Sequence, residues 1–118
     1  MEKSINHPYN WTRFYNALCR HGPNMLLGVD EDTLEIIKMF ASTTDMFWSD
    51  GLEECLAIGF ANGDRRAGVL SALELWRENV LEALDSNFGM ELDWELVCID
   101  DTSPLIDELV EAALQNPS

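Results

Sequence analysis

The sequence predicts a mainly α-helical fold: one small domain of about five helices, spanning residues 1–118, with at most one short pair of strands. Five stretches place apolar residues at the i, i+3, i+4 and i+7 spacing of a helix that buries one face. Hydrophobic residues make up 47% of the chain, which is enough for one core and too much for a disordered acidic segment. No internal repeat or low-complexity linker divides the chain, so we expect one domain.

The first helix is expected to begin near Trp11 and to stop at Gly22-Pro23, because proline cannot continue a helix. The apolar segment Met25–Val29 follows, either as a brief strand or as a buried connector. The residues of this helix that share one face are Trp11, Phe14, Tyr15, Leu18 and Cys19.

Two shorter helices are predicted next. Asp30 or Asp32 can cap the second helix, and Thr43-Thr44 weakens its end. The third is expected to be capped by the pair Asp50 and Glu53 and to end at Asn62-Gly63. The residues expected to face the core are Leu34, Ile37, Phe40, Ala41, Leu52, Cys55, Leu56, Gly59 and Phe60.

The longest helix is predicted from about Arg65 to Asn87, with Asp64 as its N-cap. At ~1.5 Å per residue it would be roughly 33 Å long, enough to cross the whole domain. Its inward face is expected to consist of Val69, Leu70, Leu73, Trp76, Val80, Leu81 and Leu84.

After Gly89 the apolar spacing changes to every second residue, from Met90 to Cys98, which predicts a strand with one buried face. The backbone of such a strand needs a partner, either Met25–Val29 or another copy of the chain. Ser103-Pro104 then starts a closing helix. Its core-facing residues are expected to be Leu105, Ile106, Leu109, Val110 and Ala113.

The charge of the chain is strongly negative and unevenly distributed. There are 22 acidic and seven basic residues, and no Lys, Arg or His follows Arg77. A net charge of −15 opposes direct binding to nucleic acid or to membrane phosphates and attracts basic proteins. The sequence therefore points to a basic protein partner.

Three successive elements carry the acidic residues that we expect to bind this partner. Glu74, Glu78, Glu82 and Asp85 form a stripe on the long helix, where Arg77 can offset only one or two turns of the charge. Glu91, Asp93 and Glu95 line one side of the predicted strand, and Asp100 and Asp101 stand at its end. Asp107, Glu108 and Glu111 continue the pattern on the last helix.

A predicted loop between helices contains three neighbouring apolar residues, Met46, Phe47 and Trp48. They insert into the core or, if exposed, form an apolar patch between Asp45 and Asp50 in which Phe47 and Trp48 anchor a partner.

The sequence offers little for catalysis, metal binding or cofactor binding. Cys19-x-His21 supplies two metal ligands where a structural zinc site needs four. The acidic run from Asp30 has Glu35 where a calcium loop requires glycine. Asp85-Ser86 resembles the attachment site of acyl carrier proteins, but Asn87 follows it and the pair ends a helix instead of starting one. We therefore expect no enzyme activity, no metal and no cofactor.

The three cysteines, Cys19, Cys55 and Cys98, are odd in number and widely spaced, which is typical of reduced thiols. No apolar leader opens the sequence, and no run approaches about 18 apolar residues. These features predict a soluble cytoplasmic protein.

Carboxylates about 6 Å apart along a helix can imitate the phosphates of a nucleic acid. A few of them around Trp94 or Trp48 could also plug one active-site cleft. We therefore hypothesise a small acidic inhibitor that occupies the substrate surface of a basic, nucleic-acid-handling enzyme. It would act as an immunity protein or antitoxin against a toxin nuclease, or as a phage anti-restriction or anti-CRISPR protein against a defence nuclease complex.

The alternative hypothesis is an adaptor or a secretion-type chaperone, as a monomer or homodimer. It would hold another chain through an apolar stripe or by adding a strand to residues 90–99.

Overall fold

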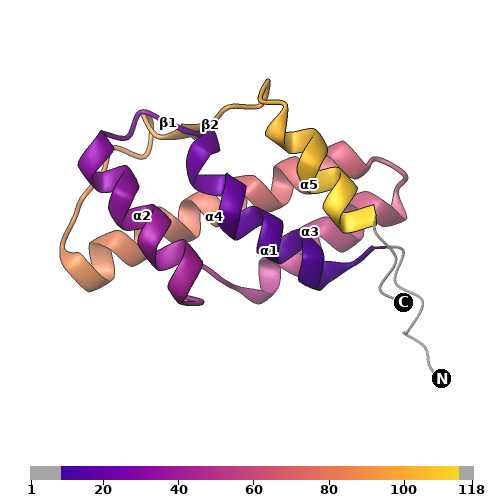
Figure 1. The fold of residues 1–118 in the computed structure, drawn as a ribbon, viewed down its shortest axis with the longest axis horizontal. Coiled ribbons are helices and arrows are strands. Elements are labelled where there is room, and N and C mark those ends of the chain that lie inside the picture. The colour runs from indigo at the N-terminus through magenta and orange to yellow at the C-terminus, as the bar shows by residue number, and fades with distance from the viewer. Residues whose placement is uncertain (1–8, 115–118) are drawn as a thin grey trace.

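The computed structural model describes residues 9–114 and confirms the mainly helical fold (Figure 1). In chain order the elements are α1 (Trp11–His21), the 3₁₀ turn η2 (Gly22–Met25), β1 (Leu26–Leu27), α2 (Glu31–Thr43), α3 (Asp50–Ala61), α4 (Arg65–Phe88), β2 (Cys98–Ile99) and α5 (Leu105–Leu114). Helix α4 runs the length of the domain, and α1, α2 and α5 lie across its front in Figure 1. Within residues 9–114, no helix is both long enough and apolar enough to cross a membrane.

The helix ends follow from short polar side chains and one glycine. The side-chain oxygens of Asn10, Asp30 and Asp64 each accept a hydrogen bond from the backbone N–H three residues further on, at 3.2, 2.7 and 3.1 Å. The predicted caps at Asp30 and Asp64 are thus confirmed. The predicted cap at Asp50 is wrong: Ser49 is the N-cap of α3, and Asp50 and Glu53 are acidic residues of its first turn. Gly89 ends α4 with a φ of +64°, which a residue with a Cβ rarely adopts.

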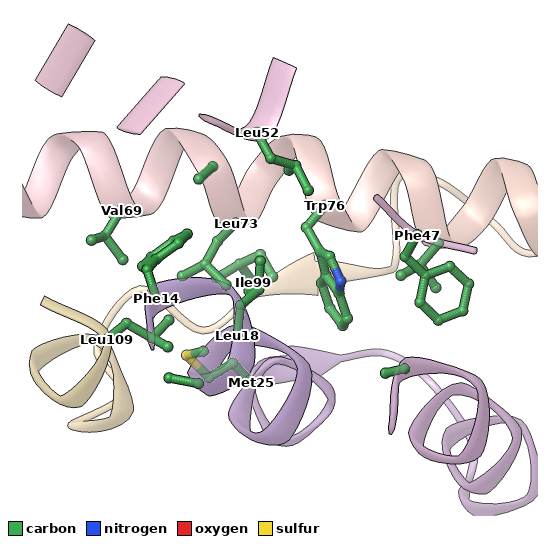
Figure 2. Packing of buried hydrophobic residues seen from close by; sticks show 14 of the residues in the cluster. Phe14, Leu18, Met25, Phe47, Leu52, Val69, Leu73, Trp76, Ile99 and Leu109 are labelled. Carbon is green, nitrogen blue, oxygen red and sulfur yellow. The ribbon is translucent and has the colours of Figure 1, made fainter. Parts of the chain in front are cut away.

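The core lies between α4 and the elements packed on both of its sides. Figure 2 shows Phe14 and Leu18 of α1 pointing toward Leu73 of α4. Trp76 is fully buried, and its ring meets that of Phe47 edge to face with centroids 6.0 Å apart. The predicted inward face of the long helix is confirmed except at Leu70, which is only partly buried.

The predicted strand over Met90–Cys98 is wrong for most of its length. Only Cys98–Ile99 pairs, antiparallel to Leu26–Leu27, so the partner is the segment Met25–Val29 of the same chain. Residues 90–97 form a loop and a turn.

The hydrogen bonds of residues 93–97 explain this difference. The Arg77 guanidinium of α4 donates to the backbone carbonyls of Trp94 and Val97, which a neighbouring strand would otherwise satisfy. The Asp93 carboxylate accepts from the N–H of Glu95 at 2.9 Å and closes a local turn. The Arg77 side chain therefore supplies hydrogen bonds that a neighbouring strand would provide in a sheet.

Helices α3 and α4 approach each other very closely at two glycines. A Cβ placed on Gly59 would lie 2.2 Å from the Cα of Gly68, and one on Gly68 would lie 2.9 Å from the Cα of Gly59. The crossing therefore requires glycine on both helices, because any side chain would push the backbones apart. It fixes where α4 lies relative to α3.

Candidate partner-binding site

The stripe predicted on the long helix is present on the solvent side of α4. Glu74, Glu78, Glu82 and Asp85 are all exposed. At ~100° per residue they fall within an arc of about 80°, and successive glutamates are ~6 Å apart along the axis. We call these four residues the α4 carboxylate face.

Within residues 9–114, no ion pair neutralises the α4 carboxylate face. Among residues 9–114 the ion pairs join Lys38 to Glu35, Arg66 to Asp107 and His21 to Glu108, at 3.7, 3.5 and 3.7 Å. None of the four face residues is part of these pairs. Arg77, the cation closest in sequence, directs its guanidinium to the carbonyls of the 94–97 turn instead of to a carboxylate. The face therefore presents uncompensated charge to solvent.

The acidic residues of the following loop belong to a segment that is attached to the same helix. Arg77 is about 100° from Glu78 around the helix, and its guanidinium holds the 94–97 turn against α4. Glu91, Asp93 and Glu95 are all exposed on this loop. Asp93 is also engaged in its own turn, where it accepts the N–H of Glu95.

The acidic residues further along the chain are more strongly committed to the fold. The Asp100 carboxylate accepts from the N–H and the hydroxyl of Thr102 at 3.1 and 2.7 Å, and these hydrogen bonds lower its pKa. Arg66 donates to the carbonyl of Asp101 at 2.7 Å and pairs with Asp107. The acidic pattern predicted to continue onto the last helix is therefore partly compensated, because Arg66 of α4 pairs with Asp107 and the His21 imidazole of α1 lies 3.7 Å from Glu108.

The two predicted aromatic anchors differ in position. Phe47 is only 2% exposed and packs against Trp76, so it is a core residue and not a partner contact. Trp48 is 44% exposed and lines a recess with Tyr15 and Asp45. Its neighbours Phe47 and Ser49 each accept a hydrogen bond from Asn79 of α4 at 3.0 Å, so this loop is attached to the helix that carries the stripe.

Trp94 is the aromatic residue of the loop that Arg77 attaches to α4. It is 44% exposed, and its backbone carbonyl is held by Arg77 on α4. Its place beside the helix depends on this hydrogen bond between residues far apart in sequence, which residue spacing alone does not reveal.

A cleft of about 740 Å³ lies between α1 and α2. Arg20 and Lys38 line it together with Tyr15, Cys19 and Asp45. Burial raises the pKa of the Cys19 thiol, and the pKa of Tyr15 is raised mainly for the same reason. Both groups are therefore neutral at physiological pH, and Cys19 is a poor nucleophile.

Metal ligands do not cluster in the part of the chain that the structure describes. No group of three or more His, Cys, Asp or Glu side chains within residues 9–114 could hold a metal ion. Cys19, Cys55 and Cys98 are free thiols.

Comparison with known proteins gives no relative from which to transfer a function. No family model matches the chain, and searches of curated proteins and of solved structures found no match.

Proposed function

We propose that this protein is a small acidic inhibitor that binds a basic, nucleic-acid-handling enzyme and covers its substrate surface. The observation that carries the proposal is the α4 carboxylate face, which is exposed and makes no ion pair within residues 9–114. Each repulsive i, i+4 pair costs an isolated helix ~0.2–0.5 kcal/mol. The surface of a soluble protein ordinarily intersperses Lys and Arg among its acidic residues. Binding to a cationic partner would explain why the α4 carboxylate face lacks such balancing cations.

The proposed mechanism is occupation of a groove and involves no chemistry on the part of the inhibitor. The groove of an enzyme that handles nucleic acid presents Lys and Arg to the phosphate backbone. Glu74, Glu78 and Glu82 repeat a negative charge every ~6 Å along a rigid rod, so they can meet several of these cations at once. Such charge complementarity speeds association and makes it sensitive to salt. The partner is a toxin nuclease or a defence nuclease complex, since both expose a groove of this kind.

The rest of the interface is proposed to come from the neighbouring loop. Glu91, Asp93 and Glu95 extend the negative charge beyond the helix, and Trp94 supplies an aromatic contact among them. An exposed aromatic within a charged rim is the usual composition of an interface hot spot.

The adaptor hypothesis finds less support in the strand content of the fold. Addition of a strand required an edge over residues 90–99, and only Cys98–Ile99 is a strand, already paired with β1 on one side. The inhibitor proposal is therefore the one that we develop.

The test is a competition experiment with the natural partner. The full-length chain is immobilised, proteins are captured from the source cell, and each captured protein is assayed for nucleic-acid binding or cleavage. The proposal expects a basic protein whose activity the free chain inhibits and whose capture is prevented by added nucleic acid. A partner that binds nucleic acid and the chain at the same time, with its activity unchanged, would contradict it.

A further inference from the structure

We propose that the partner of this protein inserts one apolar side chain into a hollow between α3 and α4 while its basic residues bind the α4 carboxylate face. This inference rests on the proposed function and specifies the chemistry of the partner. The occupant that it names is a basic amphipathic helix, with a leucine-sized anchor at one end of a row of Lys or Arg.

The hollow is a consequence of the glycine crossing. Gly59 and Gly68 carry no side chains, so the surface above their contact is depressed between the flanking residues. The space is about 430 Å³, and Asn62 and Asp64 lie at one end of it. The other residues that line it are Cys55, Ile58, Gly59, Ala67, Gly68 and Ser71.

The lining of the hollow is suited to an apolar side chain. Ile58 is 55% exposed, one of the large hydrophobic residues that the fold leaves in solvent. Burial raises the pKa of the Cys55 thiol, with a smaller contribution from Glu54, so Cys55 stays neutral and behaves as a small apolar group. Ile58, Cys55 and Ala67 can thus surround the side chain of a partner.

The hollow and the carboxylate face lie on the same line along α4. Ser71, Glu78 and Asp85 are spaced by seven residues, so they are displaced by only ~20° from one to the next. Asp64 and Ser71 line the hollow, and Glu78 and Asp85 belong to the face. From Ser71 to Glu78 the distance along the axis is about 10 Å, and to Asp85 about 21 Å.

This geometry defines what the occupant must carry. A helix laid along α4 with an apolar residue in the hollow would place its residues at successive i+4 positions opposite successive glutamates, because both helices have the same rise. The apolar anchor gives affinity and fixes the register, and the cations give attraction and speed. A basic segment without the anchor could slide along the stripe.

The experiment uses two synthetic helical peptides of about 18 residues, long enough to be helical in water. Both are alanine-based and carry Lys at three successive i+4 positions; the first has Leu one turn before the row of Lys, and the second has Ala there. Each is titrated into the isotopically labelled full-length chain at low salt, and NMR shifts of the backbone amides give both the affinity and the binding site. We expect the Leu peptide to bind about tenfold more tightly, since burying a leucine side chain contributes at least this factor. Its binding should shift the amides of Ile58, Ala67 and Ser71 in addition to those of the carboxylate face.

Two variants test whether the hollow causes the difference in affinity between the two peptides. Ser71→Leu fills the hollow from α4 and should remove the difference between the peptides, and Ser86→Leu is the matched control at an exposed position outside the hollow. Ser71→Leu replaces an exposed helical residue with a better helix former, so the fold should be kept.

The outcomes separate this inference from the proposed function. Equal affinity of the two peptides, with shifts confined to the carboxylate face, would overturn the hollow as an anchor site and leave the proposed function intact. Binding of neither peptide would contradict both, because the face would then attract no basic helix.

Discussion

Gly59 and Gly68 touch across the interface of α3 and α4, where a Cβ on Gly59 would lie 2.2 Å from the Cα of Gly68. This contact positions the third helix against the central one and leaves the hollow that the proposed partner occupies. Glycine in a helix interior normally costs up to about 1 kcal/mol relative to alanine. Two glycines that face each other therefore indicate that the close packing of the α3 and α4 backbones contributes more to stability than the glycines cost.

Gly59→Ala should destabilise the protein by about 1–3 kcal/mol, because the new methyl group meets backbone atoms that cannot move aside. Gly51→Ala, in the same helix, is the control: its Cβ would meet Cδ2 of Leu75, the tip of a side chain that can rotate. It should be close to neutral. Urea denaturation of the three proteins measures both effects, and an unfolding free energy of Gly59→Ala equal to that of the unchanged protein would rule out a tight crossing.

Arg77→Lys should release the 94–97 turn from α4, because one ammonium cannot reproduce a guanidinium that reaches the carbonyls of both Trp94 and Val97. We expect a loss of about 1–3 kcal/mol and faster hydrogen exchange at the amides of residues 96–99. Arg65→Lys, at the exposed start of the same helix, should change neither. Unaltered exchange in Arg77→Lys would mean that the turn is held by other contacts.

Glu78→Gln should stabilise the protein at low salt, by about 0.5 kcal/mol, because it removes repulsion with Glu74 and Glu82. Glu35→Gln should give a smaller gain or none, since the repulsion between Glu35 and Glu31 is offset by the ion pair of Glu35 with Lys38 at 3.7 Å. Thermal unfolding at low salt and at about 0.5 M salt measures both changes, and the gain at Glu78 should shrink as salt screens it. A loss of stability in Glu78→Gln would show that this carboxylate serves the fold.

Asp30→Asn should reduce the sensitivity of the fold to acid. The carboxylate of Asp30 accepts the N–H of Thr33 at 2.7 Å, and hydrogen bonding to Thr33 lowers its pKa in the folded protein. The unfolded chain therefore takes up the proton first, so this contribution to stability is complete above about pH 4 and is lost as the pH falls through the folded pKa. Asn keeps the cap but does not titrate. Unfolding followed from pH 6 to about pH 2.5 should show a shallower decline for Asp30→Asn, and identical slopes would contradict the role given to Asp30.

The helices were predictable from sequence because their signals are local. The N-caps at Asp30 and Asp64 and the stop at Gly22-Pro23 act within one turn of the residues that carry them. The apolar spacing of each helix likewise identified its buried face, with α4 as the clearest case.

The segment 90–97 could not be predicted because its structure depends on one distant side chain. The alternation from Met90 to Cys98 satisfies the pattern of a strand, but Trp94 and Leu96 are exposed and Arg77 binds the carbonyls. Asp93, two residues before Glu95, was the available signal for a turn.

Only the part of the candidate site that depends on local spacing could be predicted from the sequence. Helical spacing alone places three acidic residues on one face, so their position could be predicted from the sequence: Glu74, Glu78 and Glu82. The burial of Phe47 depends on Trp76, and the neutralisation of Asp107 depends on Arg66, 41 residues away. Contacts between residues far apart in sequence determine which acidic side chains remain without an ion pair. Amino-acid composition does not reveal these contacts.

The most direct test of the central claim compares two triple charge reversals in capture of the natural partner. Glu74, Glu78 and Glu82 are replaced by Lys in one protein, and the exposed acids Glu31, Glu35 and Asp45 are replaced by Lys in the other, so that both change the net charge equally. Circular dichroism should show helical proteins in both cases. We expect capture and inhibition to be lost in the first and retained in the second; equal loss in both would mean that only net charge matters, and full activity of the first would remove the α4 carboxylate face from the mechanism.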